Sequence, residues 1–193
     1  MRPHSLYQRF GKRFVDYFIV IVASLFFLPI IILIVIFIKL FDPGPVLFKQ
    51  CRVGREGASF DFYKFRSMPV NTGDIPSDQI GQIQLTWIGK FIRRTNLDEL
   101  PQLFNVIKGD MSIVGPRPPL LAQIELIELR RKSGALGCRP GLTGLAQVSS
   151  FDGMSVPEKA AFDGQYAEQI SFCADIKIML RTFLYLLKPP PKY

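Results

Sequence analysis

Two adjacent carboxylic acids, Asp98 and Glu99, are the residues best suited to chemistry in this chain of 193 residues. The flanking cations are Arg93, Arg94 and Arg117. Apolar residues recur at helical spacing after the acids (Leu100, Leu103, Phe104 and Ile107), and Lys108-Gly109 is a typical helix stop. This pattern places both acids in the first turn of a predicted helix, where the helix dipole and the arginines favour ionised carboxylates. Acids bracketed by permanent cations indicate phosphate chemistry.

The same acids have a purely structural interpretation. Asn96 with Glu99 three residues later fits a capping box, and Asp98 could itself cap the helix. Pro101 favours Asp98 as the cap, because with Asn96 as the cap this proline would remove a hydrogen bond in the second turn. The spacing alone leaves the chemical and the capping interpretations open.

The ionisable composition narrows the chemistry further. The single histidine is His4, so neither a Ser-His-Asp triad nor a histidine-based zinc site is available. Cys51, Cys138 and Cys173 are widely spaced without a CxxC motif, which fits a reducing cytoplasm rather than a disulfide framework. The net charge of +8 suits anionic lipid headgroups. Because no RNA-binding signature, basic recognition helix or zinc finger is present, we expect no nucleic-acid partner.

Residues 18–38 form an apolar run without a charged residue, long enough as a helix to span the hydrocarbon core. A secretory signal is the alternative, but the run is long, lacks a small-residue cleavage pattern and is followed directly by Lys39. Basic residues flank both ends, so the positive-inside rule draws both ends to the cytoplasm. Pro29 near the middle predicts a kink. We therefore expect residues 1–41 to form an interfacial and re-entrant membrane helix, with a complete crossing as the alternative.

Residues 42–193 are expected to form one cytoplasmic catalytic region, which makes the protein a mainly helical, membrane-associated α+β fold. Residues 46–52 and 59–65 predict the two strands of a small β-hairpin. Residues 69–84 lack periodicity and predict a surface loop.

Three further helices are expected along this region. Residues 87–94 predict a short helix before the acids, and residues 120–132 predict another that ends at Gly134. The apolar stripe of residues 176–187 predicts a C-terminal helix on the membrane surface, with packing against the protein's own core as the alternative.

Three cations stand in segments that could bind an anion. Lys64 lies near the end of the second predicted strand, where it is either a surface charge or a phosphate ligand. Arg117 lies between two prolines, which limits the backbone entropy lost when its guanidinium is held in place. Arg139 opens a second stiff loop, Arg139-Pro140-Gly141, that could offer a guanidinium and backbone N–H groups to an anion.

The order of the motifs along the chain is distinctive. The motifs are residues 50–54, 63–68, 97–106, 108–112, 115–118 and 139–148. Together they resemble the bacterial sugar transferases, the monotopic polyprenyl-phosphate phosphoglycosyl transferases. The resemblance covers about residues 7 to 187 and is to the small form of the family, without an added N-terminal transmembrane bundle.

The resemblance implies that Asp98 attacks the sugar-linked phosphate of a UDP-sugar, releases UMP and carries the phosphosugar covalently. A polyprenyl phosphate, usually undecaprenyl phosphate, would then take the phosphosugar to give a polyprenyl diphosphate sugar. Mg2+ would bridge Asp98 and the diphosphate, and Glu99 would assist at the acceptor or the metal. Pro29 would match the kink of the re-entrant helix. The implied phosphate-binding residues are Lys64, Arg93, Arg117 and Arg139.

The resemblance also implies a place in the cell: the bacterial inner membrane, monotopic and facing the cytoplasm, at the first membrane step of a glycoconjugate or polysaccharide pathway. Membrane lipids would be partners, and downstream glycosyltransferases would use the product. Asp163, Tyr166 and Asp175 match family positions and are expected to be structural more often than ligands.

Two positions depart from the family pattern, and two other functional classes remain. Leu28 precedes Pro29 where members often carry a small polar residue, and residues 149–153 replace an Asn-Gly-Arg type of turn, which leaves the identity of the sugar open.

A membrane-anchored adaptor would use the acids only as helix caps. A hydrolase would release the sugar phosphate to water.

Overall fold

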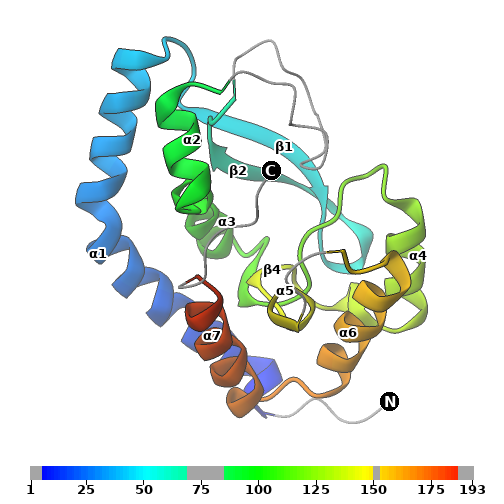
Figure 1. Cartoon of the computed structure of the whole chain (residues 1–193). Coiled ribbons are helices and arrows are strands. Elements are labelled where there is room, and N and C mark those ends of the chain that lie inside the picture. The colour runs from blue at the N-terminus through cyan, green and yellow to red at the C-terminus, as the bar shows by residue number, and fades with distance from the viewer. Residues whose placement is uncertain (1–5, 69–84, 150–152, 187–193) are drawn as a thin grey trace.

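The computed structural model describes residues 6–68, 85–149 and 153–186, which form a mainly helical chain with two small sheets (Figure 1). The expected loop at 69–84 and residues 150–152 of the departing turn lie outside the described residues. The principal elements are α1 (Lys12–Phe41), β1 (Leu47–Val53), β2 (Ser59–Phe65), α2 (Trp87–Arg94), α3 (Gln102–Lys108), β3 (Ser112–Val114), α4 (Ile124–Lys132), β4 (Gly141–Thr143), α5 (Leu145–Ser149), α6 (Val156–Glu168) and α7 (Phe172–Leu186). A π-helical turn, Tyr7–Gly11, leads directly into α1.

The apolar run lies within one long helix. α1 continues without interruption through Pro29, and its ribbon bends near the middle (Figure 1). A bend there is expected because proline cannot donate the backbone hydrogen bond to the preceding turn. The helix from Tyr7 to Phe41 is long and apolar enough to cross a membrane, and 11% of its most apolar window is buried. A core helix of a soluble domain would be mostly buried, whereas this helix leaves most of its apolar surface uncovered.

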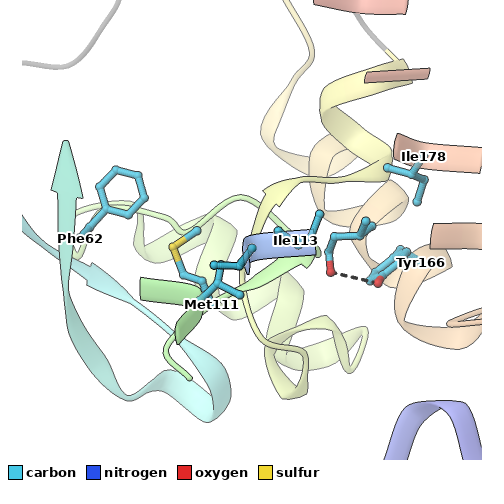
Figure 2. Packing of buried hydrophobic residues seen from close by; sticks show 8 residues of the cluster. Phe62, Met111, Ile113, Tyr166 and Ile178 are labelled. Atoms are coloured by element: carbon cyan, nitrogen blue, oxygen red, sulfur yellow. Dashed lines mark hydrogen bonds between the residues drawn. The ribbon is translucent and has the colours of Figure 1, made fainter. Parts of the chain in front are cut away.

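Four buried residues attach α1 to the rest of the fold: Asp16, Val20, Ile34 and Ile38. Val20 packs in the larger hydrophobic cluster, whose members from β2, β3, α6 and α7 include Phe62, Ile113, Tyr166 and Ile178 (Figure 2). Ile34 and Ile38 pack in a second cluster with Phe65, Ile88 and Ile92 from β2 and α2. The two halves of α1 therefore pack against two separate hydrophobic clusters.

Buried carboxylates fix the N-terminal half of α1. Asp16 accepts hydrogen bonds from the Ser112 hydroxyl at 2.9 Å and from the Ile113 backbone N–H at 3.0 Å, both in β3. Asp175 of α7 accepts from Lys12 at 2.7 Å and from the Tyr166 hydroxyl at 2.8 Å. These buried acids are satisfied by several donors each, so they tie the helix to the domain rather than cap helices.

The predicted hairpin is confirmed. β1 and β2 pair antiparallel with Leu47 opposite Phe65 and Val53 opposite Ser59. The helix predicted at 120–132 starts later, at Ile124. Leu120 is extended because it forms a bridge with Arg52 of β1, which holds the segment after the prolines out of helical conformation.

A second sheet was missed by the sequence analysis. β3 and β4 pair in parallel, with Ser112 opposite Gly141 and Val114 opposite Thr143. Strands of three residues are too short for alternation to be read from sequence. Gly115 and Gly141 allow the two chain segments to approach, because a Cβ on Gly141 would overlap the backbone of Gly115.

Replacing Gly141 with alanine should therefore destabilise the fold. We expect the Gly141→Ala variant to lose about 1–3 kcal/mol of unfolding free energy, the usual cost of forcing extra atoms into a packed site. Denaturant unfolding of the detergent-solubilised protein measures this change. Gly137→Ala is the matched control, since a Cβ there meets no atom within 4 Å among the described residues. Equal unfolding midpoints for the two variants would contradict the close approach of β3 and β4.

Candidate active site

The two acids lie on a turn of their own rather than at the start of a helix. Leu97–Glu99 forms a 3-10 turn that precedes α3, and Pro101 occupies the N-cap position of α3. Neither the 3-10 turn nor α3 has a side-chain cap. The backbone of Asn96 is in the left-handed conformation with φ of 55°, and its side chain makes no capping hydrogen bond. The predicted placement in the first turn of the helix is wrong because α-helical hydrogen bonding starts only after Pro101. The capping interpretation of both acids fails with it.

Glu99 is held by two cations. Lys64 Nζ and Arg117 Nη2 each donate to Glu99 Oε1 at 2.8 Å. Burial alone would raise the pKa of Glu99, but Arg117 and Lys64 outweigh this effect and hold its pKa below the usual range. Glu99 is therefore ionised near neutral pH, and it keeps two cations at fixed positions.

Asp98 has a different environment although it is the adjacent residue. Its exposed fraction is 7%, and the Nζ of Lys64 lies 3.5 Å from its Oδ2. Burial raises the pKa of Asp98, the neighbouring charge of Glu99 adds to the shift, and Lys64, Arg93 and Arg117 oppose it. Two adjacent carboxyls with pKa values displaced in opposite directions indicate two different roles.

Four chain segments bring the predicted residues together. Lys64 comes from the end of β2, the acids from the turn before α3, and Arg117 from the loop that follows β3. Arg93, at the end of α2, is near enough to lower the pKa of Asp98. The structure thus assembles the acids with three of the four predicted phosphate-binding cations.

Arg139 is the predicted cation that the structure places elsewhere. Its Nε donates to the Gly109 carbonyl at 3.1 Å, at the C-terminal end of α3. The acid pair precedes the other end of this seven-residue helix, which is about 10 Å long at the standard rise. Arg139 therefore makes no hydrogen bond or ion pair with Asp98 or Glu99 in the described structure. Pro29 lies in α1 and takes no part in the acid site.

Asn105 is a site-forming residue that the sequence analysis missed. Its side chain is fully buried, accepts a hydrogen bond from the Tyr63 backbone N–H at 3.2 Å and donates to the Asp61 carbonyl at 2.6 Å. These bonds hold α3 against β2 and so set the position of the acid turn relative to Lys64. A signal existed, because an amide in an apolar helical segment is unusual. The expected apolar face is partly exposed, with Phe104 and Ile107 uncovered.

The carboxylates of the site limit how a magnesium ion could bind there. The described residues contain no group of three His, Cys, Asp or Glu side chains that could hold a metal by themselves. Glu99 is engaged by two cations, which leaves Asp98 as the available carboxylate. Mg2+ is usually bound by one or two carboxylates together with substrate phosphates and water. The residues fit an ion whose coordination is completed by a phosphorylated substrate.

The site has the make-up of a phosphate-handling centre, since cations surround a carboxylate pair that includes one poorly paired acid. Comparison with known proteins agrees with this class. The chain matches the family described as bacterial sugar transferase over residues 7–189. It therefore belongs to the bacterial sugar transferase family, and the resemblance of its motifs is confirmed.

Similar proteins are named as sugar or sugar-phosphate transferases. A galactosyl transferase of Streptococcus agalactiae, CpsE, is 43% identical over 160 residues, covering 76% of this chain and 35% of the relative. A UDP-glucose:undecaprenyl-phosphate glucose-1-phosphate transferase of Caulobacter vibrioides is 38% identical over 191 residues, covering 94% of this chain and 72% of the relative. The protein of the same name from Escherichia coli is 39% identical over 194 residues, covering 93% and 41%. The chain thus spans between 35% and 72% of the length of these relatives.

Proposed function

We propose that this protein moves a sugar 1-phosphate from a UDP-sugar to a polyprenyl phosphate, undecaprenyl phosphate in particular, through a covalent phosphosugar on Asp98. The observation that carries the proposal is the asymmetry of the acid pair. Glu99 binds two cations through one oxygen, whereas Asp98 is buried and only loosely paired. A carboxylate with few donors is the better nucleophile of the two. The names of the relatives support the substrate classes.

The reaction divides into two displacements at one phosphorus atom. In the first, an oxygen of ionised Asp98 forms a bond to the phosphorus that carries the sugar, and the bond to the bridging oxygen breaks so that UMP leaves with the electron pair. In the second, an oxygen of the lipid phosphate attacks the same phosphorus, and the bond to Asp98 breaks. The carboxylate is regenerated, and the product is a polyprenyl diphosphate sugar.

The cations of the site have a role in both displacements. Lys64 and Arg117, oriented by Glu99, would donate to the phosphoryl oxygens as negative charge builds up on them. Arg93 would add to the positive potential at Asp98. Asp98 would hold Mg2+ together with the phosphorylated substrate, and the ion would supply positive charge that lowers the repulsion between a carboxylate and phosphate.

The same proposal places the protein in the cytoplasmic leaflet of the bacterial inner membrane. α1 would enter the membrane and return through the bend around Pro29, and α7 would lie on the surface beside the N-terminal half of α1 (Figure 1). Large apolar side chains of α7 are exposed: Leu180, Phe183, Leu184 and Leu186. Lipid phosphate at headgroup level could then meet a UDP-sugar from the cytoplasm. Downstream glycosyltransferases of a glycan pathway would be the functional partners.

UMP release tests the proposal directly. The purified full chain is incubated with Mg2+ and each of a panel of UDP-sugars, with and without undecaprenyl phosphate. We expect a stoichiometric burst of UMP without the acceptor and continuous turnover with it, because the covalent step precedes the lipid step. Turnover without the acceptor would identify a hydrolase. Absence of UMP with every sugar would favour an adaptor.

Membrane topology tests the re-entrant arrangement. Leu6→Cys and Ala58→Cys, each in a background with Cys51, Cys138 and Cys173 changed to serine, place single thiols at exposed positions on either side of α1. In sealed inside-out vesicles we expect an impermeant maleimide to label both thiols, because basic flanks keep both ends cytoplasmic. Labelling of one thiol in inside-out vesicles and of the other in right-side-out vesicles would show a complete crossing.

A further inference from the structure

The loop that carries Arg117 is held at four consecutive carbonyl groups. Pro116 O accepts from Gly141 N at 2.9 Å, and Pro119 O accepts from Val53 N at 3.1 Å. Pro118 O accepts from Arg52 Nη1 at 3.2 Å. Arg117 O accepts from Arg130 Nη1 at 2.8 Å. Three of the four residues are prolines and have no N–H to donate, so the loop is fixed through its acceptors.

Arg117 is the one member of this clamped stretch whose side chain reaches the acid pair. The range of φ and ψ angles that Arg117 can adopt is restricted because Pro118 follows it. The bond from Arg130 to its carbonyl then fixes the orientation of the peptide plane. The side chain of Arg117 is 47% exposed, and Nη2 is held by Glu99 at 2.8 Å. Because its backbone is held firmly, the partly exposed guanidinium of Arg117 can stay in one position.

Arg130 is itself immobilised by an acid on another helix. Its Nε and Nη2 donate to Asp163 Oδ2 at 2.8 and 2.6 Å, which joins α4 to α6. The exposed fractions are 4% for Arg130 and 1% for Asp163, so the pair is shielded from solvent. Two nitrogens of the Arg130 guanidinium thus donate to Asp163, and the third donates to the carbonyl of Arg117.

A helix-joining ion pair would need only the contact between Arg130 and Asp163. The extra bond to the Arg117 carbonyl connects this pair to the acid site, because the Arg117 side chain donates to Glu99. Lysine at position 130 would keep the charge that Asp163 needs but present a single nitrogen in place of a planar fork.

We propose that Arg130, oriented by Asp163, is a positioning residue that holds the Arg117 guanidinium in place for the phosphoryl group of the nucleotide-sugar substrate. The inference rests on the proposed function, since it assigns Arg117 to that phosphoryl group. Neither Arg130 nor Asp163 touches the acids, so both act through Arg117.

Arg130→Lys tests the proposal in the full-length protein, with Arg131→Lys as the matched control. Arg131 lies next in the same helix, and its side chain is 59% exposed. We expect Arg130→Lys to lower kcat/KM for UMP release about tenfold, within the range known for small displacements of a positioning group. In an Arg117→Gln background the same change should cost less than about twofold, because residues that act as a unit are not additive. Arg131→Lys should change neither value.

Hydrogen exchange of residues 111–121 gives a readout that does not depend on activity. We expect faster exchange of this segment in Arg130→Lys than in Arg131→Lys, with unchanged exchange in β2. If Arg130→Lys does not fold, the paired replacement Arg130→Met with Asp163→Leu removes both charges together and leaves none unpaired. It should show the same loss of kcat/KM and the same faster exchange.

Two results would overturn the positioning role. An equal loss in the Arg117-intact and Arg117→Gln backgrounds would make the ion pair a general support of the fold. Unchanged kcat/KM together with unchanged exchange would show that the loop does not need Arg130. Failure of the unaltered protein to release UMP would instead defeat the proposed function. The comparison of hydrogen exchange would then show by itself whether Arg130 holds the loop of Arg117.

Discussion

The Asp98→Asn variant should release no UMP and form no phosphosugar adduct. Asparagine has nearly the same shape as aspartate but lacks an anionic oxygen that can bond to phosphorus. Loss of a covalent nucleophile lowers kcat by about 10^3-fold or more, because neighbouring groups cannot replace it. The adduct is measured by intact-protein mass after incubation with a UDP-sugar in the absence of lipid acceptor.

Stability separates this result from a structural role of Asp98. A helix cap would cost about 0.5–2 kcal/mol when removed. Asp98 makes no cap, and burial raises its pKa, so neutralising it removes a charge that the fold disfavours. The unfolding midpoint of Asp98→Asn should therefore not fall. Glu128→Gln, an exposed acid on α4, is the control for both measurements. An active Asp98→Asn protein would refute covalent catalysis at this position.

The Lys64→Met variant should lose about 10^2-fold in kcat/KM, the usual effect of removing one preorganised donor at a developing charge. Lys64 donates to Glu99 at 2.8 Å and lies 3.5 Å from Asp98, so its loss affects both acids. Methionine preserves most of the length of the side chain and removes the charge. Initial rates of UMP release at varied UDP-sugar concentration measure the change.

The pH profile of the same variant has a defined direction. Lys64 lowers the pKa of Asp98 against the effect of burial, so removing Lys64 raises that pKa further. The nucleophile must be ionised, and activity is lost as pH falls through its pKa. The acid limb should therefore move to higher pH in Lys64→Met and stay in place in Lys49→Met, which removes an exposed lysine of β1 that pairs with Asp61. An unmoved acid limb would separate Lys64 from the ionisation of Asp98.

Several local features followed from the order of residues. The hairpin was predictable because its turn and its alternating strands lie within 19 residues, from Leu47 to Phe65. The short helix Trp87–Arg94 and the stop at Gly109, whose φ is 91°, follow from caps and breakers. The two acids are neighbours by covalent connection, and the motifs around them were sufficient to indicate the family.

Pairing between distant segments could not be predicted in the same way. β3 and β4 are three residues each, and their pairing depends on the close approach of two glycines. The role of Asn105 depends on the backbone of β2, and the buried pair of Arg130 and Asp163 joins residues 33 positions apart. Periodicity indicates which faces of an element are apolar, but it does not say what lies against them.

The sequence by itself determined the membrane-type helix, the hairpin and the presence of an acid pair among cations, because these depend on neighbouring residues. Only the tertiary structure decided that Glu99 binds Lys64, 35 positions away, and Arg117, 18 positions away, and that Arg139 lies instead at Gly109. The difference between the acids has the same origin. Burial and the placement of charges from other segments set their pKa values, and neither can be read from the adjacent positions that Asp98 and Glu99 occupy.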